Sequence, residues 1–247
     1  MKRPALFVII LLMALGTVQT PVANAQFDSI LEGLKKVFGG RELSETKIIQ
    51  GLKEALQIGT GNAIREVSGL DGYYRNPKIR IPLPDAVQKV KKLLTVAGYG
   101  PKVEAFELSM NRAAERAAPE AKSLFLDGIR QMTFSDARKI LRGGDNEATL
   151  YFKDKTYHRL HEIFKPIVHS AMSEVGVTRA YQELDAKVRS IPFTDRLRFD
   201  LDEYVTDKGL DGLFFILGEE ERKIRQDPAA RVTDLLKEVF GSRSRGD

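Results

Sequence analysis

The chain has 247 residues and a formal net charge of +5, with 43% hydrophobic and 30% charged residues. Charges of both signs in this proportion are typical of a mixed, solvated surface and argue against a nucleic-acid partner. The sequence has no cysteine, which excludes disulfides, thiolate catalysis and Cys-ligated metals. The fold must therefore be stabilised by its hydrophobic core, for which this length is sufficient.

The first residues have the pattern of a secretory signal peptide. Lys2 and Arg3 precede an uninterrupted apolar run from Ala5 to Leu15, and residues 23–25 read Ala-Asn-Ala. We predict cleavage after Ala25. The apolar run is shorter than the roughly 20 residues that a membrane-spanning helix needs. No longer run follows it, so we predict no transmembrane span after signal cleavage.

Helical periodicity dominates the rest of the chain, with Gly and Pro between the periodic segments. We predict an all-α fold, a multi-helix bundle of about nine helices with one short extended, proline-rich segment. The predicted domains are a signal peptide over 1–25, an amphipathic helix with a Gly-Gly joint over 26–40, and a single helical domain over 41–247. Ser135 and Asp145 are the expected N-caps of two helices. The predicted helices cover approximately 27–38, 44–67, 84–97, 102–118, 119–131, 135–142, 145–175, 178–188, 202–226 and 228–240.

The segment "NPKIRIPLPD", residues 76–85, interrupts the helical pattern. Its three prolines disfavour a helix, and the alternation of Ile79, Arg80 and Ile81 favours extended backbone over 78–82. In one interpretation the isoleucines fix the segment to the bundle as a stiff connection. In the other it is a recognition surface, or it pairs with a partner's strand. The candidate binding residues here are Tyr73, Tyr74, Arg75, Asn76 and Arg80.

A second candidate group lies on the helix "KVEAFELSMNRAAERAA", opposite its apolar stripe. This polar side carries Glu104, Glu107, Asn111 and Glu115. Leu108 lies among them, which indicates that the side is partly covered. Buried Asn111 and Arg112 would then need hydrogen-bond partners. These residues are candidates for structural polar contacts or for a ligand site.

A third group begins the helix near Asp202. Asp207 and Asp211 lie one turn apart, with Tyr204 on the same side. Like charges at this spacing repel each other, so a cation or a basic helix opposite would stabilise them. Paired carboxylates can also transfer protons. Two glycines in the same helix, Gly209 and Gly212, indicate a tight crossing.

The histidines are close together in "YHRLHEIFKPIVHS". His158, His161, Glu162 and His169 fall within about 100° of helical arc and could hold zinc or copper. The apolar residues of the helix lie on the other side, so we expect the histidines to face water unless another helix covers them. We therefore predict no metal and no cofactor, and keep these four residues as weak candidate ligands.

Several long stretches resemble the domain-of-unknown-function 4197 family. They include "NPKIRIPLP", "ELSMNRAAE" and "LDEYVTDKGLDGLF", and the resemblance extends over roughly Phe27 to Gly241. It implies an exported, helical protein of Gram-negative bacteria, and it implies no activity, cofactor or catalytic residue.

Together these observations favour a periplasmic binding or interaction module of the cell envelope. Its partner would be an envelope protein, a glycan or a small molecule. One alternative is a carboxylate-dependent enzyme that acts on an envelope polymer or a small molecule. Another is a peripheral membrane protein attached through the helix at 27–38, whose Lys35 and Lys36 would meet anionic lipid.

Overall fold

The computed structural model describes residues 45–174 and 200–226, and these residues form an all-α fold, as predicted. They contain fewer helices than were predicted, because the segments expected at 27–38, 178–188 and 228–240 lie outside the described residues. A π-helical turn, η1 (Thr95–Tyr99), and a 3-10 turn, η2 (Ala118–Glu120), join neighbouring helices. The α-helices are α2 (Glu45–Ser68), α3 (Asp85–Leu94), α4 (Gly100–Ala117), α5 (Ala121–Gln131), α6 (Phe134–Arg142), α7 (Glu147–Glu174) and α9 (Leu201–Gln226).

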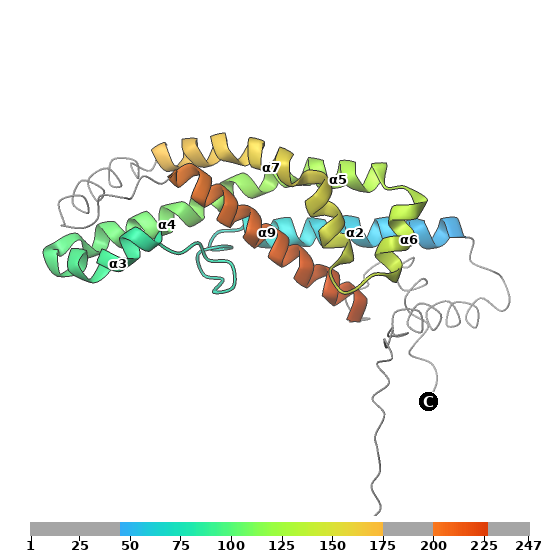
Figure 1. Cartoon of the computed structure of the whole chain (residues 1–247), viewed down its shortest axis with the longest axis horizontal. Helices are drawn as coiled ribbons and strands as arrows, with labels where there is room; N and C mark the ends of the chain where they lie inside the picture. The colour runs from blue at the N-terminus through green and yellow to red at the C-terminus, as the bar shows by residue number, and fades with distance from the viewer. Residues whose placement is uncertain (1–44, 175–199, 227–247) are drawn as a thin grey trace, which may run out of the picture.

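Helix α9 lies at the centre of the packing, against α7 and α2, and α4 packs against α7 (Figure 1). Aromatic rings from three helices meet in the core. The ring centroids of Phe125 and Phe152 are 5.2 Å apart, and those of Phe125 and Phe214 are 5.9 Å apart. Such tilted and edge-on pairs add to the burial of apolar area. The predicted apolar stripe of α4 is buried throughout, at Val103, Phe106, Met110, Ala113, Ala114 and Ala117.

The beginning of α7 is capped by a side chain from α9. The carboxylate of Glu221 accepts hydrogen bonds from the backbone N–H groups of Ala148 (2.9 Å) and Thr149 (2.8 Å). Arg225 neutralises this buried carboxylate at 2.7 Å and also donates to the carbonyl of Ile140. The sequence predicted a local cap by Asp145, whose carboxylate instead accepts from Gln226. A long-range cap of this kind fixes α7 and α9 relative to each other.

The cap of α6 is also not the predicted one. Thr133, and not Ser135, is the N-cap: its hydroxyl accepts from the N–H of Asp136, whose side chain accepts in return from the N–H of Thr133. This is a capping box, in which two otherwise unpaired donors are satisfied. Since Asp136 is three residues after Thr133, the box places the N-cap two residues before the predicted one, and the helix starts at Phe134.

Between α2 and α3 the chain is only partly extended. Turns occupy the backbone as far as Ile79, where the N–H groups of Ile79 and Arg80 both donate to the carbonyl of Asn76. Residues 80–84 are free of helix and turn, so the extended stretch begins two residues later than predicted and pairs with no strand among the described residues. The alternation was nevertheless informative, because Ile79, Ile81 and Leu83 are all buried.

Helices α3 and α4 form a hairpin at one end of the molecule (Figure 1). The turn is η1, in which Gly98 has φ +85°, a conformation that side-chain-bearing residues rarely adopt. The sequence predicted a break over Gly98 to Pro101, and α4 begins at Gly100 with Pro101 in its first turn, where proline is favoured.

Candidate functional site

The proline-rich segment is held against α4 by one amide side chain. The N–H of Ile81 donates to Oδ1 of Asn111 (2.8 Å), and Nδ2 of Asn111 donates to the carbonyl of Ile81 (2.9 Å). Nδ2 also reaches the carbonyl of Glu107 within its own helix. Asn111 is fully buried, so all these groups are paired away from water, as buried polar groups require.

One turn further along α4, an ionic network binds the residues that directly precede the segment. Glu115 is buried and accepts from the N–H groups of Tyr73 (3.1 Å) and Tyr74 (3.3 Å). Arg112 bridges Glu115 (2.6 Å) and Asp71 (2.7 Å). Asp71, just after the end of α2, has φ +66°, a backbone conformation that is uncommon for residues other than glycine. Its ion pair with Arg112 lies at this turn.

Tyr73 inserts its ring between the segment and α9. It is completely buried, and its hydroxyl donates to the carbonyl of Gly209 at 2.6 Å. Burial, with the nearby charge of Glu115 second, raises the pKa of the Tyr73 phenol. A Cβ atom at Gly212 would lie 2.6 Å from this ring, so only glycine fits there. Gly209 faces Ala114 of α4, which is the tight crossing that the sequence predicted.

The remaining predicted residues of the segment are nearer the surface. Arg80 lies over the ring of Tyr74, 4.3 Å from its centroid, and pairs with Glu107 at 3.0 Å. Arg75 pairs with Asp71 at 2.9 Å. Asn76 makes a local contact, accepting from the N–H of Lys78. Most of the candidate residues around the segment therefore contact one another or their immediate neighbours. Recognition of a partner by these residues remains a prediction.

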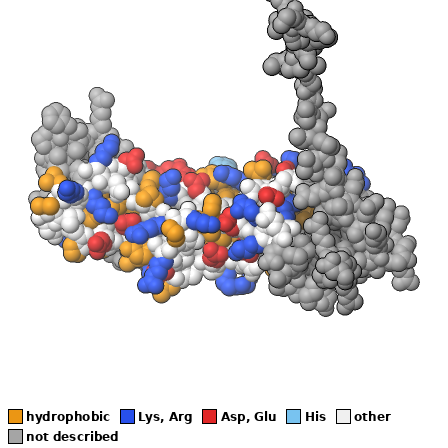
Figure 2. Space-filling model, turned by 90° about the horizontal axis from the view of Figure 1, so that it is seen from below, with side chains coloured by type: hydrophobic (Ala, Val, Ile, Leu, Met, Phe, Trp, Pro, Cys, Tyr) orange, Lys and Arg blue, Asp and Glu red, His pale blue; other side chains and the backbone are white. Residues whose placement is uncertain are grey.

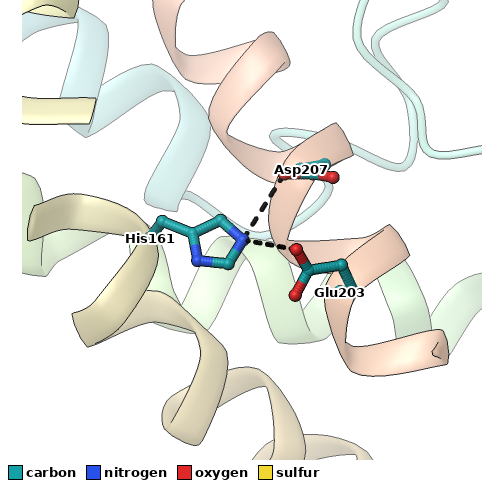
Figure 3. A group of neighbouring side chains, drawn as sticks. All are labelled: His161, Glu203 and Asp207. Carbon is teal, nitrogen blue, oxygen red and sulfur yellow. Dashed lines mark ion pairs between the residues drawn. The ribbon is translucent and has the colours of Figure 1, made fainter. Parts of the chain in front are cut away.

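A second polar cluster lies between α7 and α9 (Figure 3). Nε2 of His161 is 3.2 Å from Oε1 of Glu203 and 3.5 Å from Oδ1 of Asp207. Glu203 and Asp207 are four residues apart and therefore project from the same face of α9. His161 is the most covered of the three, with 21% of its side chain exposed. Both carboxylates are half-exposed, so the cluster opens to solvent.

The other predicted ligands do not join this cluster. His158 pairs with Glu162 on the exposed surface of α7, and His169 pairs with Asp202 at 2.7 Å. Tyr204 is turned away from Asp207 and donates to the carbonyl of Pro82. Asp211 is 4.0 Å from Lys208 in its own helix.

Neighbouring groups hold the two carboxylates of the cluster in place. Lys165 donates to Oε2 of Glu203 (2.7 Å) and to Asp200 (2.9 Å), and these bonds raise the pKa of Lys165 and lower that of Glu203. The hydroxyl of Tyr157 donates to Asp207 at 3.1 Å. Desolvation, followed by the charge of Asp207, raises the pKa of Tyr157 to about 12, so this phenol remains a donor at neutral pH.

Sequence reasoning missed Glu203 and Lys165. The candidate residues predicted on this helix include Asp207 but not Glu203. The signal that identifies it is its spacing of four from Asp207, which places both carboxylates on one face. Nothing in the sequence alone shows that this face meets His161, because the contact joins two helices that are far apart in the chain.

The hairpin tip is the third notable surface. Leu93 is 53% exposed and Val96 is 82% exposed, one helical turn apart. Residues 86–103 contain four lysines and no acidic residue. In Figure 2, hydrophobic and basic side chains lie next to each other at this end of the molecule. Within the described residues, no helix has the length and apolar character needed to cross a bilayer.

Comparison with known proteins gives one match. Searches of curated proteins and of solved structures found none. A family model described as "Protein of unknown function (DUF4197)" matches residues 42–241. This range contains all the described residues, including the segment, the cluster and the hairpin. Since the match covers most of the sequence, the chain belongs to the DUF4197 family.

Proposed function

We propose that this protein is a periplasmic binding module of the Gram-negative cell envelope that attaches reversibly to an anionic membrane surface through the α3–α4 hairpin. The signal-peptide pattern of residues 1–25 supports export. The observation that carries the proposal is the composition of the hairpin tip, where exposed apolar side chains lie among lysines and residues 86–103 include no acidic residue.

The apolar part of the tip supplies an insertion site. Leu93 and Val96 present most of their side chains to solvent at the turn of the hairpin. Transfer of these two side chains into the interface would contribute about 3 kcal/mol. The turn at Gly98 brings the end of α3 and the start of α4 together at one end of the molecule (Figure 1).

The basic part supplies electrostatic attraction. Lys89, Lys92 and Lys102 are exposed, and Lys91 is partly exposed and 3.8 Å from Glu107. A lysine close to an anionic bilayer contributes about 1 kcal/mol. With the apolar contribution, the attachment has about the strength of one myristoyl chain, which gives a reversible association constant of about 10⁴ M⁻¹. The protein would therefore exchange between membrane and solution.

Vesicle flotation of the purified chain tests this proposal. We expect the protein to float with vesicles rich in phosphatidylglycerol and not with pure phosphatidylcholine, and to be released at high salt because the charges are then screened. The double variant Leu93→Ser/Val96→Ser should lose flotation. Leu150→Ser, at a side chain of α7 that is 58% exposed, is the matched control and should float normally.

A second pair of variants distinguishes attachment through the hairpin from attachment through the amino-terminal helix predicted at 27–38. The variant Lys35→Gln/Lys36→Gln should retain flotation, whereas Lys89→Gln/Lys92→Gln should reduce it. Flotation that survives both hairpin variants, or that is absent for the unmodified protein with anionic vesicles, would exclude the hairpin as the attachment site.

A further inference from the structure

We propose that His161, Glu203 and Asp207 form a binding site for one divalent transition-metal ion, with Zn²⁺ as the best fit. This goes beyond membrane attachment and uses a different part of the molecule, the junction of α7 and α9 (Figure 3). The three side chains each offer one ligand atom, and these atoms all lie within 4.8 Å of one another.

Two of the three distances between the ligand atoms agree with tetrahedral coordination, and the third is at most 4.8 Å. Two ligand atoms that are each about 2.1 Å from a tetrahedral ion are about 3.4 Å from each other. Nε2 of His161 is 3.2 Å from the nearest oxygen of Glu203 and 3.5 Å from that of Asp207. An ion can therefore enter among the three atoms with small side-chain adjustments.

The types of ligand also fit the ion. Zn²⁺ accepts an imidazole nitrogen together with carboxylate oxygens, and two carboxylates balance its charge. Three protein ligands leave a fourth position for water or for an outside group, as the half-exposed carboxylates allow. Both carboxylates come from one helix and the imidazole from another, so the ion would also join α7 to α9.

The surrounding groups orient the ligands in the manner of an outer coordination shell. Lys165 donates to Oε2 of Glu203, which leaves Oε1 directed at His161. The hydroxyl of Tyr157 donates to Oδ1 of Asp207, the same oxygen that faces His161.

The alternative to a metal site is an ion pair of His161 with the same two carboxylates. Isothermal titration calorimetry with Zn²⁺, on the full chain prepared without a histidine tag, separates them. We expect one Zn²⁺ per chain. His161→Gln and Glu203→Gln should each abolish this binding, with far-UV circular dichroism showing that both variants are folded.

The remaining histidines provide matched controls. His158→Gln and His169→Gln should bind Zn²⁺ as the unmodified protein does, because neither side chain reaches the cluster. Tyr157→Phe should weaken binding by about tenfold or more, the usual cost of losing an outer-shell partner. Absence of a saturable heat, or equal losses in the control variants and in His161→Gln, would overturn the proposal in favour of a simple ion pair.

Discussion

Gly212 shows how one residue on α9 decides whether the segment can pack. A methyl group at this position would lie 2.6 Å from the ring of Tyr73 and 3.1 Å from Cβ of Ile79. Real Cβ atoms do not tolerate the first of these distances, so the ring or the helix would have to move. In α2, by contrast, Gly61 has no atom within 4 Å of the corresponding position.

These two glycines give opposite predictions for the same substitution. Gly212→Ala should lower the free energy of unfolding by about 1–3 kcal/mol, because it overpacks the Tyr73 contact. Gly61→Ala should raise it by about 0.5–1 kcal/mol, because alanine is the better helix former. Urea unfolding followed by circular dichroism measures both. Equal stabilities for the two variants would contradict the close packing at Gly212.

For individual residues of α4, some predictions from the sequence are confirmed. Asn111 and Arg112 were expected to need partners, and both have them. The periodicity of α4 identified its polar face, and Leu108 indicated correctly that the face is covered. The identity of the cover did not follow, because Asn111 binds the backbone of Ile81, thirty residues away. A hydrogen bond to a distant backbone group cannot be predicted from the pattern of side chains along the sequence.

At the scale of the elements, helix positions were easier to predict than helix ends. The apolar repeats and the Gly and Pro residues located every helix that the described residues contain. The caps differed: α6 begins at a Thr133–Asp136 box and α7 is capped by Glu221 of α9. A cap supplied by a distant helix depends on tertiary packing, which local sequence does not specify.

The box of α6 gives a pH-dependent prediction. Hydrogen bonds from the Thr133 side chain and backbone lower the pKa of Asp136 below its usual 3.8. The stabilisation that these hydrogen bonds give the folded state is therefore present above pH 3.8, and it is lost as the pH falls through the lowered pKa of Asp136. Thr133→Ala should cost about 1 kcal/mol of unfolding free energy at neutral pH, and its cost should shrink below about pH 4.

Ser135→Ala is the control for this cap, since Ser135 is exposed and the sequence alone favoured it as the N-cap. It should leave the free energy of unfolding nearly unchanged at every pH. A larger effect from Ser135→Ala than from Thr133→Ala, in urea titrations at matched pH, would refute the observed cap.

At the scale of the whole molecule, one hydrophobic core connects the described helices. Its buried residues come from α2 through α7 and from α9, and they include the segment at Ile79 and Ile81. The single helical domain predicted for 41–247 remains a prediction. A shared core makes the helices depend on one another for stability.

We therefore expect one cooperative unfolding transition. Circular dichroism reports all helices, whereas tyrosine fluorescence reports places as different as Tyr73 in the core and Tyr99 at the hairpin. The chain has seven tyrosines and no tryptophan, so its fluorescence comes from tyrosine alone. Their urea transitions should coincide. A fluorescence change at lower urea than the loss of helix would show that part of the molecule unfolds independently.

The amide of Asn111 also has a consequence for self-association. An extended apolar stretch such as "IRIPL" exposes backbone donors and acceptors that neighbouring molecules can pair with, which is a route to aggregation. In this fold Asn111 occupies both groups of Ile81, as an adjacent strand would. Asn111 therefore protects the centre of the stretch against edge-to-edge pairing, and this part of the protection exists only once α4 has folded.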